Sequence, residues 1–245
     1  MFTKKEVIAL LISILVFAFI FGFDDGRQTF NASYWLANFF TIVIIIAISL
    51  LVRELVIKFF AKRHEAESQY KIWQMEYLWF DKKVKLIRPL PFGIIISLIL
   101  AVYSKGTFFF TAIGKHDLIL NKSVRVGRQR INLKYFEEAQ IISTGIVASL
   151  FLSIIVLLFG RLTNTDFSRF VNINFYLALF NMIPFSSLDG AKIFFGSLTL
   201  YIFMAIFVIG AFLLIQLNVV IALLVAFLIA SVIAIIYFLK ANDLF

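Results

Sequence analysis

The chain has 245 residues, of which 62% are hydrophobic, 17% are aromatic and only 15% are charged. A soluble domain is about half apolar and about a quarter charged, so this composition excludes an ordinary water-soluble fold and indicates a protein that uses a lipid bilayer as its solvent. The absence of cysteine excludes disulfides, thiolate zinc sites and a cysteine nucleophile. The formal net charge of +9 fits either nucleic-acid binding or a membrane topology signal.

Six apolar segments are long enough to cross a bilayer as helices, which takes about 20 mostly apolar residues. They are residues 7–23, 34–52, 139–160, 171–188, 198–215 and 218–240. Pro184 interrupts the fourth segment, and only the polar stretch 216–218 separates the last two. The sequence therefore predicts an all-α polytopic membrane protein with about six spans, folded as a single domain over residues 1–245.

The apolar segment 92–104 is too short to span a bilayer, because it measures only about 20 Å as a helix. A second apolar stretch follows it, so we predict that residues 91–114 form a re-entrant hairpin packed against protein. Alternating apolar and charged residues over 117–134 predict short strands at the membrane surface. Residues 63–88 are polar with interleaved aromatics, which favours an interfacial segment anchored by Trp73 and Trp79.

Lysine and arginine residues divide unequally between the two sides of this topology. With the N-terminus inside and residues 91–114 re-entrant, 20 of them lie inside and 3 lie outside. This is a strong positive-inside pattern. The net charge therefore indicates orientation in a cell membrane, with both termini cytoplasmic, and we expect no nucleic-acid binding.

Charged residues are rare within the apolar segments, and such residues are functional candidates by default because burying them in lipid is costly. Arg53 and Glu54 stand at the inner end of the second span, and Asp189 follows the interrupted fourth span. A proline within a span frees backbone carbonyls. Pro184, with Asn181 one turn before it, therefore predicts a widened polar pocket beside Asp189.

The pattern Asn181-x-x-Pro184 followed by Leu188-Asp189-Gly190 resembles the second signature of the site-2 protease family of intramembrane zinc metalloproteases. Residues 75–79 resemble the Glu-Tyr-x-x-Trp stretch of archaeal-type members, and residues 144–149 align with a family stretch at the start of the third span. The resemblance covers about residues 1–195. It implies a site-2-protease-like fold, with Asp189 at the third zinc-ligand position and Glu54 at the position of the general base.

The same resemblance implies a groove for a client peptide, lined by Asn181, Pro184, Ser149 and Gly145. In active members, two histidines in His-Glu-x-x-His hold the zinc from one helix face. Here that motif reads Arg53-Glu54-Leu55-Val56-Ile57, so Arg53 and Ile57 replace both histidines. The two histidines of the chain, His64 and His116, stand elsewhere.

A catalytic zinc ion normally has three protein ligands, so we expect no metal, no cofactor and no proteolysis, with Glu54 a vestigial general base. Arg53 is predicted to pair with Asp189 and to supply the charge that zinc supplies in active members. The alternative for Arg53 is that its side chain extends to the lipid headgroups.

By analogy with inactive rhomboids, a protease fold that has lost its catalytic activity is predicted to bind transmembrane client or partner proteins, or to serve as a subunit of a larger membrane complex. The alternative is an active intramembrane metalloprotease with a non-standard zinc site at Glu54 and Asp189. A transporter or channel would need more polar residues in the last two spans than Gln216 and Asn218.

Overall fold

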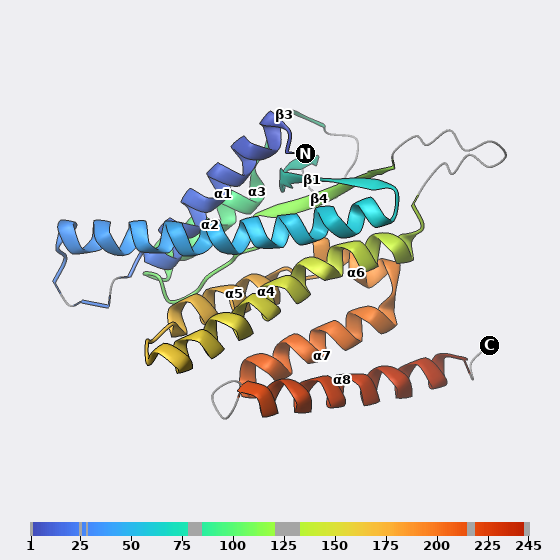
Figure 1. Cartoon of the computed structure of the whole chain (residues 1–245). Helices are drawn as coiled ribbons and strands as arrows, with labels where there is room; N and C mark the ends of the chain where they lie inside the picture. Colours follow the sequence, from blue (N-terminus) through green and yellow to red (C-terminus); the bar gives the residue numbers. More distant parts are fainter. Residues whose placement is uncertain are drawn as a thin grey trace. The chain divides into compact units, whose positions relative to one another are not determined.

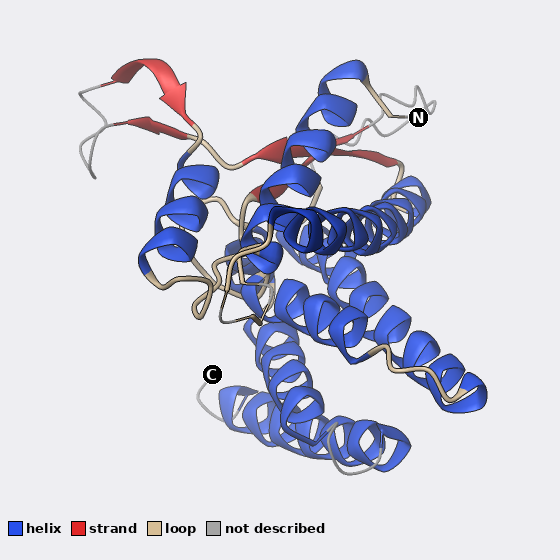
Figure 2. Ribbon diagram, turned by 90° about the vertical axis from the view of Figure 1, so that its left-hand side faces the viewer, coloured by secondary structure: helices blue, strands red, loops and turns tan. Residues whose placement is uncertain are grey.

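The computed structural model describes residues 2–24, 26–27, 29–77, 85–120, 133–214 and 219–242. Helices make up most of the described chain and strands are few, as Figure 2 shows. The chain divides into two compact units. The first unit comprises Met1–Leu51 and Ser68–Asp117, and the second comprises Val52–Glu67 and Leu118–Phe245. The single domain over residues 1–245 expected from the sequence stays a prediction.

Among the described residues, three helices are long and apolar enough to cross a membrane: α1 (Lys4–Gly22), α2 (Ala32–Arg63) and α4 (Tyr135–Thr163). Shorter apolar helices are present at Phe92–Tyr103, Leu198–Leu213 and Leu224–Leu239. The protein is therefore a helical membrane protein. The count of six spans and the orientation of the termini stay predictions.

Helix α2 is longer than the predicted span 34–52, because it continues past residue 52 to Arg63. The stretch after residue 52 is rich in charged residues, which ends an apolar segment in a hydropathy pattern. Its lysine, glutamate, leucine and alanine residues are nevertheless good helix formers, and no glycine or proline interrupts them. Arg53 and Glu54 consequently lie within a continuous helix and not at its end.

The first unit joins α1 to the segment 91–114 that the sequence predicts to be a hairpin. The helix of this segment, α3 (Phe92–Tyr103), packs beside α1 (Figure 1). The two ends of the segment meet, since a Cβ atom on Gly93 would lie 2.8 Å from the carbonyl oxygen of Ile113. Only glycine permits this approach. The hairpin geometry agrees with the prediction, while its insertion from one side of the membrane remains a prediction.

The tip of this hairpin lies at the C-terminal end of α1. The rings of Phe21 and Phe109 pack with centroids 5.1 Å apart, and Gly106 adopts a positive φ of 82° against Asp24. The segment therefore extends along the second half of α1 and reaches the end of α1 that is opposite to Lys4.

The polar segment 63–88 forms strands after α2 ends. Strand β1 (Ala66–Ile72) pairs with β4 (Gly114–Leu120), and β2 (Met75–Tyr77) pairs antiparallel with β3 (Lys85–Leu90). Strand β4 confirms the predicted strand over residues 117–120. The rest of that prediction, residues 121–132, lies outside the described residues.

The interpretation of Trp73 as an interfacial anchor is wrong. Its side chain is only 2% exposed, and its indole packs edge-on against Phe92 with centroids 5.1 Å apart. The backbone of Trp73 also donates to Ile113 and accepts from Gly93. Trp73 therefore fixes the two ends of the hairpin to each other. Trp79 lies outside the described residues.

The second unit contains α4, α5 (Ser168–Phe180), α6 (Asp189–Gly196), α7 (Leu198–Leu214) and α8 (Val219–Asn242). Helix α4 packs against α5 and α6, and α7 packs against α8 (Figure 1). Their buried apolar side chains form one core that includes Ile146, Phe175, Met204 and Val208. Before α5, Ser168 donates its hydroxyl and its backbone N–H to Asp166, and these bonds lower the pKa of that exposed carboxyl.

The interruption predicted within residues 171–188 is present, but it begins before Pro184, because α5 ends at Phe180. Asn181 caps the end of the helix and donates its side-chain amide to the carbonyl of Leu177. The residues up to Leu188 form turns, with Ser186 at a φ of 53°. Pro184 has no N–H to continue a helical ladder, so the chain restarts as α6 only at Asp189.

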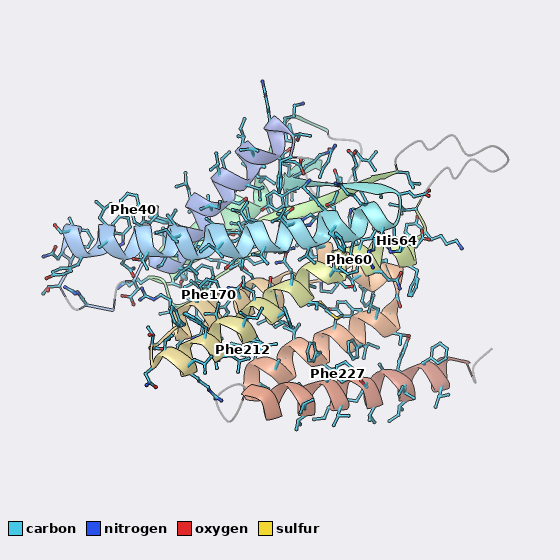
Figure 3. All side chains as sticks on the ribbon, viewed as in Figure 1. Phe40, Phe60, His64, Phe170, Phe212 and Phe227 are labelled. Atoms are coloured by element: carbon cyan, nitrogen blue, oxygen red, sulfur yellow. The ribbon has the colours of Figure 1, made fainter. Side chains whose placement is uncertain are left out.

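Helices α7 and α8 pack through aromatic rings. Phe227 on α8, labelled in Figure 3, meets the rings of Phe203 and Phe207 edge-on, with centroids 5.7 and 6.1 Å away. Gly210 lets α8 approach, since a Cβ atom there would lie 3.1 Å from that of Ala226. The polar turn predicted at 216–218 lies outside the described residues.

Candidate functional site

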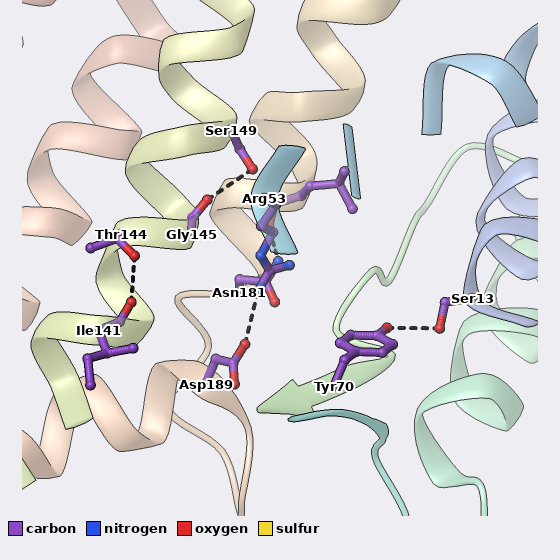
Figure 4. A network of polar contacts seen from close by, with 10 residues as sticks. Ser13, Arg53, Tyr70, Ile141, Thr144, Gly145, Ser149, Asn181 and Asp189 are labelled. Atoms are coloured by element: carbon purple, nitrogen blue, oxygen red, sulfur yellow. Dashed lines mark hydrogen bonds and ion pairs between the residues drawn. The ribbon is translucent and has the colours of Figure 1, made fainter. Parts of the chain in front are cut away.

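The centre of the candidate site is an ion pair between Arg53 on α2 and Asp189 on α6. Arg53 Nη2 donates to Asp189 Oδ2 at 2.9 Å, as Figure 4 shows. Arg53 is 4% exposed and Asp189 is 1% exposed. The predicted contact between Arg53 and Asp189 is therefore present. The Arg53 side chain is buried and does not extend toward the lipid headgroups.

Local structure places Asp189 for this contact. Asp189 is the first residue of α6, where backbone N–H groups and the helix dipole favour a negative charge. Gly190 packs against the turn before it, because a Cβ atom there would lie 2.5 Å from the carbonyl oxygen of Ile183. The interruption after Asn181 thus brings the start of α6 back toward the end of α5 and presents Asp189 to Arg53.

On the other side of the pair, α2 approaches α4 at Gly145. A Cβ atom on Gly145 would lie 2.5 Å from Ile57 Cδ1 and 3.2 Å from Arg53 Nε. Ile57 is fully buried and packs with Ala61 and Ile141. The small residue on α4 therefore leaves room for the side chains of Arg53 and Ile57, the two positions at which the resemblance implies zinc-binding histidines.

The four residues expected to line a client groove differ in exposure. Gly145, Ser149 and Asn181 are buried, and Ser149 donates its hydroxyl to the Gly145 carbonyl at 3.2 Å (Figure 4). Pro184 is exposed and lines an apolar cavity of about 350 Å³ between the end of α5 and α7. Of the four, Pro184 alone lines this cavity.

The residues present do not fit a catalytic zinc ion. Glu54 is fully buried and Asp189 bonds to a guanidinium, while Ile57 offers no donor atom. Within the described ranges, no three His, Asp or Glu side chains gather where they could hold a metal ion. Glu54 and Asp189 together supply only carboxylate oxygens, whereas catalytic zinc takes three protein ligands, usually with imidazole among them.

Neither histidine of the chain lies beside Glu54 in the candidate site. His64 follows the end of α2, which places it about 15 Å along the helix from Glu54 at about 1.5 Å per residue. His116 is fully buried in β4, and its ring packs edge-on against Tyr70 in the first unit. Neither stands where the resemblance places a zinc ligand.

The sequence did not point to a second buried polar cluster, which lies in the first unit. Glu6 is 2% exposed and accepts the backbone N–H groups of Thr3 at 2.8 Å and Tyr70 at 3.1 Å. The Tyr70 hydroxyl bonds to the Ser13 hydroxyl at 2.8 Å, as Figure 4 shows. The one available signal was the spacing Thr3-x-x-Glu6, which is that of a helix capping box.

Comparison of the chain with protein families, with curated proteins and with solved structures finds no match.

Proposed function

We propose that this protein is a site-2-protease-like membrane protein that binds transmembrane segments of client or partner proteins and does not cleave them. The buried pair of Arg53 and Asp189, with donor and acceptor 2.9 Å apart, carries the proposal. It occupies the two positions at which the family resemblance places the first and third zinc ligands. The guanidinium then takes the place of the metal as the positive charge between α2 and α6.

The pair supports a structural role because of its chemistry. A guanidinium is planar, stays protonated and offers several N–H donors in fixed directions. A buried charge is costly unless it is paired, so Arg53 and Asp189 stabilise the arrangement in which α2 and α6 meet. In this proposal Glu54 remains as a vestige of the general base, because it has no metal-bound water to activate.

The cavity at Pro184 supports the binding half of the proposal. Its walls are apolar and include Phe180, Ile183 and Tyr201, while Pro184 and Phe185 at the interruption are exposed. Irregular backbone at membrane depth persists only where protein or a cavity covers it. A client helix whose apolar side chains enter this cavity would cover the interruption between α5 and α6.

Photo-crosslinking in native membranes tests the binding surface. A photoreactive residue in place of Phe185, which is 49% exposed, is expected to give discrete crosslinks to other membrane proteins. The control is the same residue in place of Phe227 on α8, which is 50% exposed and lies far from Pro184 in sequence. Protein crosslinks of equal pattern at both positions, or at neither, would contradict the proposal.

Incubation of the purified protein with a synthetic transmembrane peptide tests the absence of cleavage. We expect intact peptide and no stoichiometric zinc by elemental analysis. Cleavage that is lost in Glu54→Ala, together with stoichiometric zinc, would overturn the proposal and establish the active metalloprotease in its place.

A further inference from the structure

We propose that the first unit carries a binding site for the phosphate of an anionic phospholipid, between the N-terminus of α1 and the strands β1 and β4. A cavity of about 740 Å³ lies there. Its lining includes Lys4, Lys5, Lys71 and Lys115, together with Ile8 and Ile12. This site is independent of the proposed client binding.

The cavity has an excess of positive charge. Four lysines line it against two acidic residues, Glu6 and Asp117. Glu6 is buried and accepts backbone N–H groups, and Asp117 pairs with Lys71 at 2.9 Å. Lys4 and Lys5 form no ion pair with any described residue. Two ammonium groups are therefore available for an anion.

An apolar wall continues from the lysines along α1. Ile8 is 58% exposed and Ile12, one turn further, is 37% exposed. Helix α1 has 19 residues, or about 28 Å at about 1.5 Å per residue, which matches the hydrocarbon thickness of a bilayer. Lys4 and Lys5 then lie at headgroup depth, and the isoleucines lie beside the acyl chains. A phospholipid contacts both the lysines and the apolar wall, whereas a soluble phosphate contacts only the lysines.

Positive-inside topology alone accounts for lysines near a helix end but not for a cavity. Here the lysines come from three separate segments. The buried Glu6 holds two of these segments together by accepting the N–H of Tyr70 on β1. The side chain of Lys115 on β4 is only 20% exposed, so its aliphatic stem is packed and not extended into water. Basic pockets of this kind at the membrane surface bind anionic headgroups.

The test uses the full-length protein in nanodiscs with spin-labelled lipids. We expect a larger immobilised fraction for phosphatidylglycerol than for phosphatidylcholine. The double variant Lys4→Gln, Lys5→Gln is expected to lose this preference, by about fivefold in relative affinity per lysine. The matched control is Lys62→Gln, Lys105→Gln, which removes two exposed lysines that do not line the cavity and is expected to keep the preference.

A second variant tests the acyl wall without any change in charge. Ile12→Trp fills the wall beside α1 and is expected to lower the immobilised fraction of phosphatidylglycerol. This variant also keeps the proposal testable if loss of Lys4 and Lys5 prevents membrane insertion. Equal lipid preference in the lysine variant and its control, or displacement of the lipid by millimolar inorganic phosphate, would overturn the proposal.

Discussion

Of the almost fully buried carboxylates in the described part of the chain, Glu6 belongs to the first unit, and Glu54 and Asp189 belong to the second. Asp189 and Glu6 are held in different ways. Asp189 in the second unit bonds to the guanidinium of Arg53, which lies 136 residues away in sequence. Glu6 in the first unit accepts hydrogen bonds from the backbone of Thr3 and Tyr70. The Asp189 carboxylate is thus compensated by an opposite charge at the start of a helix, and the Glu6 carboxylate by neutral backbone N–H groups.

The two ways of compensating a buried carboxylate differ in how they respond to substitution. A buried ion pair depends on both members, because removal of one leaves the other as an uncompensated charge at low dielectric. Backbone N–H groups cannot be removed by a change of side chain, and each contributes a charge-assisted bond of modest strength. A single substitution of Asp189 or Arg53 should therefore lower the free energy of unfolding more than a single substitution of Glu6.

The largest expected effect is that of Arg53→Met. Methionine keeps most of the apolar contact but removes the charge, and loss of one partner of a buried pair costs about 3–5 kcal/mol. The free energy of unfolding in mixed detergent micelles would measure this loss. The double variant Arg53→Met, Asp189→Leu should recover most of it, because neither charge then remains buried alone.

Lys192→Met provides the matched control for this substitution. Lys192 also pairs with a carboxylate, that of Glu138 at 2.8 Å, but its side chain is 19% exposed and that of Glu138 is 23% exposed. We expect a loss of only about 0.5–1 kcal/mol there. Equal losses for Arg53→Met and Lys192→Met would mean that the fully buried pair contributes no more than the partly buried one.

A smaller loss, about 2 kcal/mol, is expected for Glu6→Gln. Glutamine is of similar size but has one acceptor oxygen where glutamate has two, so one of the N–H groups of Thr3 and Tyr70 would face another donor. The same unfolding measurement applies, with the exposed Glu67→Gln as the control, expected within about 0.5 kcal/mol of wild type. A loss as large as that of Arg53→Met would remove the distinction between the two carboxylates.

The sequence predicted the Arg53–Asp189 contact because the family resemblance assigned both residues to the same site. The close fit around it could not be predicted in the same way. Gly145 aligns with a stretch that implied an open groove, but Ile57 and Arg53 fill the space beside it. The long side chain of Arg53 and the branched side chain of Ile57 fill volume that a ligand-binding site would leave open.

The ends of α5 and α2 differ from the ends of the predicted spans because hydropathy does not register helix caps or helix propensity. Hydropathy extends residues 171–188 past Asn181 because the apolar residues continue, yet the helix ends where the Asn181 side chain caps it ahead of Pro184. Hydropathy likewise ends the second span at residue 52, although charged residues continue α2 to Arg63. The Glu6–Tyr70 bond was beyond prediction, because the capping box alone explains Glu6 and its second partner is 64 residues away.

The smallest of these effects concerns the hydroxyl pair that completes the cluster of the first unit. Tyr70→Phe removes the bond to Ser13 and should cost about 1 kcal/mol, since a neutral hydrogen bond contributes about that much. Ser13→Ala should cost a similar amount, and the double variant should cost less than the sum, because each single change already removes the same bond. Strict additivity in this cycle would show that the two hydroxyls do not interact. A coupling of about 0.5–1 kcal/mol would instead mean that this cluster, like the Glu6 carboxylate beside it, is stabilised by several weak bonds, in contrast to the single strong pair at Arg53.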